Sequence, residues 1–303
     1  MTNFEILQLA VYHAGFKINS VEDLADLQQK LEENYLKVKE ANVYEELQEF
    51  VLKVIEEDAI YPDFSDEMIR KALSLGYYPM SLEKLVASIE EYKQYFDLVS
   101  KVEPASEKSS YYWRYYLTIR HHLNKLIIDF DRFTFPKKTY RHVRQKFSDY
   151  TLTFNRNFDL CAKRIMERYQ EEGTWLVPPL VKEFKQIHNH PDFQVSVDSV
   201  ELWHGDELVA GELGFVTRNA YASLCGFHTE NNSGTVQMAA LGTLLKEMGF
   251  AYWDLGMEMD YKYVYGAVKM DRSAQKELFD KLSDTRLALP KETFRIGDVI
   301  KQK

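Results

Sequence analysis

Three runs of alternating apolar and polar residues, joined by short polar turns, constrain the fold more than any other feature of the chain. Alternation with a period of two is typical of strands that bury one face, and short turns join such strands as antiparallel neighbours. The runs cover residues 197–203, 208–215 and 220–227. The sequence therefore predicts three strands in meander order.

A loop, a helix and a further strand are predicted directly after the meander. Residues 228–234 are polar, and residues 236–248 place apolar side chains on one helical face. Gly249 follows where a C-terminal cap belongs, and residues 250–255 predict the next strand. Asp254 then stands at the carboxyl end of a strand, the usual place for sites in α/β sheets.

The composition is that of an ordinary soluble globular protein, with 45% hydrophobic and 28% charged residues. Two cysteines, Cys161 and Cys225, cannot form a disulfide framework, which favours a reducing compartment. The first residues lack the pattern of a secretory signal, and no apolar run approaches the ~20 residues that span a bilayer. We therefore expect a cytoplasmic protein without a membrane partner.

Residues 1–60 predict an acidic helical extension. Leucines and valines recur at three- and four-residue spacings, among 13 Asp and Glu against 5 Lys and Arg. Two interpretations stay open for this segment: contact with a partner protein, or inert packing against the rest of the chain.

A polar linker over residues 103–109 is the best domain boundary. It separates a small N-terminal domain, residues 61–108, from a larger domain, residues 109–303. The small domain begins with a predicted helix over 68–75 and an apolar turn over 77–80. Helix and strand patterns alternate in the larger domain, so the fold class is α+β or α/β with a mixed sheet.

Residues 108–146 are strongly basic, with 10 Lys and Arg against 2 Asp. Such a local patch could bind a polyanion although the whole chain carries a net charge of −9. A solvated charged face is the alternative. The exposed basic residues at the predicted helix over 140–147 are Lys137, Lys138, Arg141, Arg144 and Lys146.

Seven segments, in order and spacing, resemble the bacterial leucyl/phenylalanyl-tRNA–protein transferase family over about residues 61–282. They are Gly76-Tyr77-Tyr78-Pro79-Met80, Phe158-Asp159 with Cys161, Gly173-Thr174-Trp175-Leu176, Ser199-Val200-Glu201-Leu202-Trp203, Glu207-Leu208-Val209-Ala210-Gly211, Asp254-Leu255-Gly256, and Tyr265-Gly266-Ala267 with Arg272.

The resemblance implies an N-acetyltransferase-like fold that uses aminoacyl-tRNA as a co-substrate and needs no cofactor. The family moves leucine or phenylalanine from the tRNA to the N-terminus of a protein or peptide, which marks that protein for degradation in the N-degron pathway. The chemistry is aminolysis of an ester, which needs an unprotonated amine and a polarised carbonyl.

The resemblance also implies roles for individual residues. Asp254 matches the catalytic aspartate that orients or deprotonates the amine. The glutamine that assists it is Gly256 here, and the position of a family acid falls near Ser223. Trp175 and Met80 would wall the side-chain pocket, and the five basic residues Lys137, Lys138, Arg141, Arg144 and Lys146 would hold the tRNA.

Further residues stand out near the same predicted strands. Gln237 begins the helix after the loop, where it could reach a phosphate or a carbonyl. Period-two alternation places Cys225 and Phe227 on one side of their strand together with Ser223, with Cys225 as a buried thiol. Glu201 faces away from its apolar neighbours, so we expect it at a solvated edge. A metal site is not expected, because His121 and His122 lack a third ligand.

Two alternative functions stay open. The first is an acyl-CoA-dependent N-acyltransferase of the same fold, with residues 231–235 as a loose phosphate loop. The second is a catalytically silent module that binds tRNA or protein, which the departures at Ser223 and Gly256 would favour.

Overall fold

The computed structural model describes residues 58–61, 64, 66–86, 103–104, 112–120, 122–170 and 173–301. Nearly all of the predicted acidic extension and most of the predicted linker lie outside these residues. The predicted domain boundaries therefore stay predictions. The chain forms two compact units, residues 1–64 with 80–121 and residues 65–79 with 122–303.

The described strands of the first unit belong to a four-stranded sheet of order β1-β4-β2, with β3 paired to β4. The bounds are β1 Asp58–Tyr61, β2 Tyr78–Val86, β3 Glu103–Pro104 and β4 Tyr112–Arg120. β1 and β3 pair antiparallel with β4. The predicted turn over 77–80 is wrong, because β2 already begins at Tyr78.

The second unit is built on an eight-stranded mixed sheet of order β11-β5-β10-β9-β8-β7-β6-β12. The predicted meander is confirmed, since β7, β8 and β9 are antiparallel neighbours. β10 pairs parallel with β9 and antiparallel with β5. The bounds are β5 Asn124–Asp129, β6 Thr151–Phe154, β7 Val195–His204, β8 Glu207–Thr217, β9 Ala220–His228, β10 Tyr252–Asp254, β11 Val268–Asp271 and β12 Phe294–Arg295.

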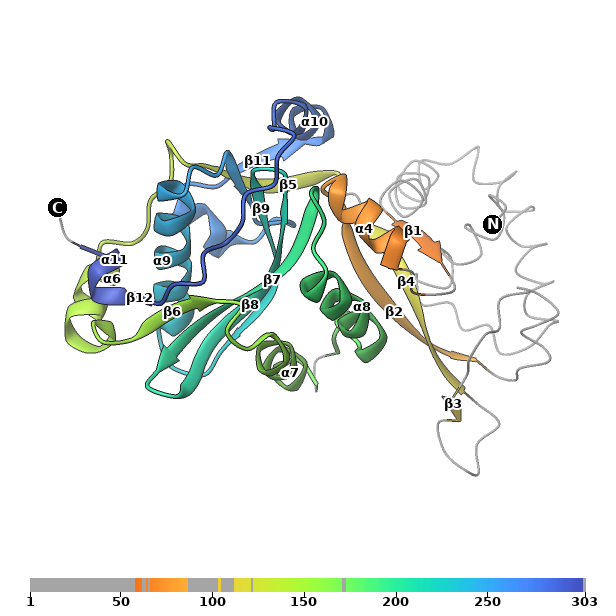
Figure 1. The fold of residues 1–303 in the computed structure, drawn as a ribbon, viewed down its shortest axis with the longest axis horizontal. Coiled ribbons are helices and arrows are strands. Elements are labelled where there is room, and N and C mark those ends of the chain that lie inside the picture. The colour runs from red at the N-terminus through yellow and green to blue at the C-terminus, as the bar shows by residue number, and fades with distance from the viewer. Residues whose placement is uncertain are drawn as a thin grey trace, which may run out of the picture. The chain divides into compact units, whose positions relative to one another are not determined.

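Helices cover both faces of this sheet (Figure 1). One face packs against α9 with α6, η1 and α11, and the other against α4, α7 and α8. Among the described helices none is long and apolar enough to cross a membrane. The bounds are α4 Asp66–Ser74, α6 Lys138–His142, the π-helix η1 Val143–Phe147, α7 Phe158–Arg168, α8 Pro178–Asn189, α9 Ser233–Glu247, the 3-10 helix η2 Asp260–Tyr265, α10 Arg272–Asp280 and α11 Ile296–Val299.

The predicted segment after the meander is confirmed. The helix α9 ends at Glu247, and Gly249 adopts a left-handed φ of +79°. The Phe250 N–H bonds to the Leu245 carbonyl at 3.1 Å, which closes the helix end. The α+β class with an acyltransferase-like mixed sheet is confirmed with it.

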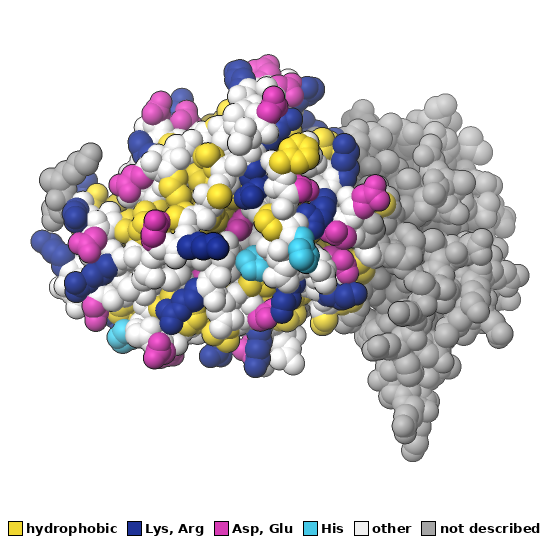
Figure 2. Space-filling model, in the orientation of Figure 1, with side chains coloured by type: hydrophobic (Ala, Val, Ile, Leu, Met, Phe, Trp, Pro, Cys, Tyr) yellow, Lys and Arg dark blue, Asp and Glu magenta, His cyan; other side chains and the backbone are white. Residues whose placement is uncertain are grey.

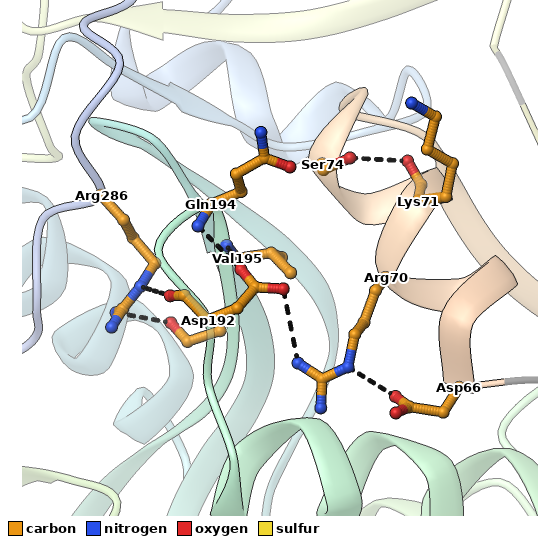
Figure 3. Close-up of polar contacts among 9 residues, drawn as sticks. Asp66, Arg70, Lys71, Ser74, Asp192, Gln194, Val195 and Arg286 are labelled. Atoms are coloured by element: carbon orange, nitrogen blue, oxygen red, sulfur yellow. Dashed lines mark hydrogen bonds and ion pairs between the residues drawn. The ribbon is translucent and has the colours of Figure 1, made fainter.

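Polar contacts hold α4 against the start of β7 (Figure 3). Arg70 Nε lies 2.8 Å from Asp66 Oδ1 of its own helix, and Arg70 Nη1 lies 3.6 Å from Asp192 Oδ2. Asp192 accepts hydrogen bonds from the N–H groups of Gln194 and Val195, and the Arg286 side chain donates to its carbonyl. Three segments far apart in sequence are therefore fixed together at this corner.

A β-bulge in β9 reverses one prediction about side-chain direction. Leu213 pairs with Cys225, but the next residue of β8, Gly214, pairs with Ser223, so Leu224 is an extra residue in β9. The prediction that Ser223 shares a side with Cys225 and Phe227 is therefore wrong. Ser223 faces α9, while Cys225 and Phe227 face α7.

We predict that Gly266→Ala destabilises the second unit strongly. Gly266 has a φ of +84°, and an added Cβ would lie 2.1 Å from the Arg132 carbonyl oxygen. Strain and the backbone clash together should lower the free energy of unfolding by about 3 kcal/mol or more, measured by urea denaturation. Gly205→Ala is the matched control, since its φ is +60° with nothing within 4 Å. It should cost only about 1 to 2 kcal/mol.

Candidate functional site

The central sheet opens where β10 ends. β10 pairs with β9 from Tyr252 to Asp254, and Ala222 is the last partner on β9. The Leu255 N–H then bonds to the Leu126 carbonyl of β5 at 2.8 Å, and the Leu126 N–H bonds to the Gly256 carbonyl at 2.9 Å. Within the described residues, β9 beyond Ala222 has no strand partner on this side. Residues 223–226 are partly exposed although β9 is a central strand, so a ligand could reach them here.

Asp254 forms a buried ion pair at this opening. Its Oδ2 lies 2.8 Å from Lys125 Nζ, and the two side chains are 7% and 6% exposed. Lys125 also donates to the Gly76 carbonyl at 2.7 Å, and the Gly256 N–H donates to Asp254 Oδ1 at 2.8 Å. Both carboxylate oxygens therefore have a donor from the protein, which fixes the turn after β10.

Tyr78 packs on the same face of the sheet as Asp254 and Lys125. Lys125 Nζ lies 4.8 Å from the centre of the Tyr78 ring, and the ring packs edge-on against Phe215 and His122. Burial, and then the charge of Asp254, raise the pKa of Tyr78. A hydrogen bond to Asp254 acts in the same direction on the pKa of Tyr78. Gly256 lies against this ring with a φ of +68°, so a glutamine at this position would be strained.

A second buried carboxylate, Glu212, was not singled out from the sequence. It lies on β8 and is 7% exposed. Its Oε1 accepts hydrogen bonds from the hydroxyls of Tyr221 and Ser223, each at 2.8 Å, and its Oε2 accepts from Gln237 Nε2 at 3.3 Å. The available signal was its place as the one charged residue between Leu208 and Val216 in a run that is otherwise apolar.

Burial changes the proton affinity of groups in this part of the structure. Burial raises the pKa of Glu212 to about 7, although the hydrogen bonds from Ser223 and Tyr221 and the charge of Lys262 act against it. Burial likewise lowers the pKa of Lys262 to about 8. Lys262 Nζ donates to the carbonyls of Leu255 and Met257 at 2.6 and 2.8 Å, which holds η2 against the opening.

The predicted site residues divide between the two faces of the sheet. Ser223 and Gln237 gather at Glu212 on the α9 face. Asp254 and Gly256 lie together on the opposite face, with Lys125 and Tyr78. The strand β9 lies between β10, which carries Asp254, and β8, which carries Glu212.

Cys225 and Phe227 lie on the α7 side of β9. A Cβ at Gly211 would lie 2.9 Å from both Cys161 Sγ and the Phe227 ring, so these side chains pack together. Burial, and then the charge of Glu212, raise the pKa of Cys225. Cys225 is thus a thiol rather than a nucleophilic thiolate, although it is partly exposed and not buried as predicted.

Two predicted pocket residues lie outside both groups. Trp175 is half-buried just before α8, and Met80 is a half-buried residue of β2 in the first unit. Their roles in a side-chain pocket stay predictions.

The five predicted tRNA-binding residues lie together on α6, η1 and the residue before them, and all are exposed. Lys146 pairs with Glu230 in the loop before α9. The other four make no ion pair with any described residue. Figure 2 shows several Lys and Arg side chains at the end of the second unit where Figure 1 places α6 and α11, with a few acidic ones among them.

The burial of Glu201 differs from the prediction. It is fully buried rather than at a solvated edge. Its carboxylate accepts bonds from Thr153 and Ser199, each at 2.7 Å, and from the N–H groups of Arg156 and Asn157. It is therefore a structural carboxylate that anchors the start of α7 to β7.

We predict that Lys125→Met destabilises the protein by about 3 to 5 kcal/mol, because it leaves the buried Asp254 carboxylate without its cation. Thermal and urea unfolding measure the effect. The double variant Lys125→Met with Asp254→Leu should recover most of the loss, since an apolar pair replaces the ion pair. A loss below about 1 kcal/mol for Lys125→Met alone would show that Asp254 does not depend on this partner.

Comparison with known proteins agrees with the residues quoted above. The model of the family described as leucyl/phenylalanyl-tRNA protein transferase matches residues 127–280, about half of the chain. That range runs from the second half of β5 to the end of α10, and it contains β9, residues 255–257, Glu212 and Asp254.

Curated relatives bear the same family name. The leucyl/phenylalanyl-tRNA–protein transferase of Pseudoalteromonas atlantica is 27% identical over 55% of this chain and 70% of its own. Those of Shewanella woodyi and Nostoc punctiforme are 25% and 26% identical, over 49% and 50% of this chain and 61% and 74% of their own. This chain therefore spans about two thirds of the length of these relatives.

Proposed function

Because the chain belongs to the leucyl/phenylalanyl-tRNA–protein transferase family, we propose that it moves an amino acid from aminoacyl-tRNA to the N-terminus of a protein or peptide. The observation that supports this most is the opening between β9 and residues 255–257, which falls inside the range that matches the family. It offers an unpaired strand edge with a buried carboxylate on each face of the sheet.

The reaction is aminolysis of an activated ester, so positioning of the two substrates contributes much of the rate. In this proposal Asp254 acts as a positioning residue. Lys125 and the Gly256 N–H hold its two oxygens, and Asp254 in turn holds the backbone at which the strands part. The donor ester is already activated, so the proposal includes no cofactor.

The side-chain pocket of the donor is proposed on the α7 side of the sheet. Cys225 and Phe227 face that side and would line it. Trp175, which precedes α8, is proposed as a wall of this pocket on the strength of the resemblance alone. An apolar pocket of this kind suits leucine or phenylalanine.

The basic residues on α6 and η1 are proposed to bind the tRNA backbone. They are exposed, and four of the five have no acidic partner among the described residues. Lys146 links this surface to Glu230 in the loop between β9 and α9. A protein that uses charged tRNA would work in the cytoplasm. The proposed partner contact of residues 1–60 lies outside the described residues.

We predict transfer of radiolabel from one charged tRNA to peptides with a free N-terminus. The assay offers a panel of charged tRNAs, peptides with varied N-terminal residues, and labelled acetyl-CoA in parallel. Label from leucyl- or phenylalanyl-tRNA supports the proposal. Label from acetyl-CoA alone would favour an N-acyltransferase, and tRNA binding without transfer from any donor would indicate a silent module.

We predict that reversing the charge of Arg141 and Arg144 to Glu weakens tRNA binding at least tenfold. The slope of log affinity against log salt concentration should become shallower by about 2, because two phosphate contacts are lost. Filter binding at several salt concentrations measures both quantities. Lys163→Glu with Lys182→Glu is the matched control, since these exposed lysines lie on α7 and α8. Equal loss in both variants would argue against a specific surface.

A further inference from the structure

Glu212 has the surroundings of a group that exchanges a proton rather than one that holds the fold. Its three direct hydrogen-bond donors are neutral: Tyr221, Ser223 and Gln237. Glu201 on the neighbouring strand is as deeply buried, but four donors hold its two oxygens at 2.7 to 3.2 Å. Glu212 Oε2, with one contact at 3.3 Å, keeps room for another donor.

The hydrogen-bond directions around Glu212 are fixed. The Trp253 indole N–H, which can only donate, bonds to Ser223 Oγ at 2.9 Å. The Ser223 hydroxyl must then direct its own proton to Glu212 Oε1. Tyr221 donates to the same oxygen. This position of the Tyr221 hydroxyl requires a glycine at residue 214, because a Cβ there would lie 2.2 Å from the hydroxyl. The free acceptor position of the carboxylate is therefore on Oε2.

Ser223 links this carboxylate to the opening. It is the first residue of β9 beyond the last pair with β10, and it is partly exposed. Gln237 reaches the carboxylate from the first turns of α9. Other titratable groups interact with the Glu212 charge: Tyr261 and Lys262 from η2, Cys161 from α7, and Tyr221 and Cys225 from β9.

We propose that Glu212 binds the α-ammonium group of the acceptor peptide through Oε2 and takes the proton that the amine must lose before it attacks. This inference rests on the proposed function and adds the residue that handles the proton. The amine then forms a bond to the carbonyl carbon of the aminoacyl ester, and the bond from that carbon to the ribose oxygen breaks. The second proton of the attacking nitrogen passes to the ribose oxygen, and Glu212 returns its proton to the solvent.

The proton affinities of the two groups match. A peptide α-amine has a pKa of about 7.7 to 8.0, and an ordinary glutamate, near 4.3, would be too weak a base for it. Burial raises the pKa of Glu212 to about 7, within about one unit of the amine. Proton transfer between groups so matched is efficient near neutral pH.

The first test compares Glu212→Gln with Glu201→Gln in peptide transfer between about pH 6 and 9. For Glu212→Gln we expect kcat/KM for the acceptor to fall at least tenfold at pH 7. It should then rise about tenfold per pH unit toward the pKa of the amine, because the solvent must now remove the proton. Glu201→Gln should keep the wild-type pH profile. A wild-type profile in Glu212→Gln would overturn the proposal.

Ser223→Ala provides a second test that keeps the carboxylate. Loss of this hydrogen bond to the charged form raises the pKa of Glu212 further. The acidic limb of the transfer profile should therefore move to higher pH, while the rate on the plateau changes little. An unmoved limb would contradict the proposal.

Peptide binding tests the proposal apart from transfer. Calorimetry compares one peptide with a free N-terminus and the same peptide with an acetylated N-terminus. The wild-type protein should prefer the free amine at least tenfold, and Glu212→Gln should lose that preference. A preference that is absent in the wild type or that survives in the variant overturns the proposal. If the preference depends on Glu212 but no donor transfers label, the proposed function fails and the amine site stands.

Discussion

The site depends on a change in backbone pairing directly after β10. Leu255 and Gly256 bond to Leu126 on β5 and not to β9, although β10 itself had paired with both strands. Each strand edge can be satisfied by one neighbour at a time, so β9 beyond Ala222 is left open. The left-handed backbone of Gly256 and the bond from its N–H to Asp254 fix this change of direction.

The two buried carboxylates at the opening are stabilised by different means, and that difference suits them to different tasks. Asp254 contacts a cation, Lys125, which compensates its charge and keeps it in one position. Glu212 contacts only neutral donors, so burial dominates and raises its pKa to about 7. One carboxylate can hold the backbone while the other exchanges a proton, and the open edge of β9 lies between them.

The elements around the site were predictable because their signals are local. Alternation gave β7, β8 and β9, and the apolar face ending at Gly249 gave α9. The pairing of these elements into a family fold followed from the order of motifs such as Asp254-Leu255-Gly256. The grouping of side chains was less accessible. Period-two counting placed Ser223 with Cys225, but the extra residue Leu224 turns them to opposite faces.

The sequence by itself determined the order of strands and helices, the end of α9, the position of Asp254 at a strand end and the exposed basic residues of α6 and η1. These follow from spacing along the chain, since periodicity and caps act over a few residues. Only the tertiary structure decided that Lys125 partners Asp254, that Ser223 and Gln237 meet at Glu212, and that Glu201 is buried and fully bonded. Those contacts join residues 11 to 129 positions apart, and burial and hydrogen bonding across strands have no local signature in the sequence.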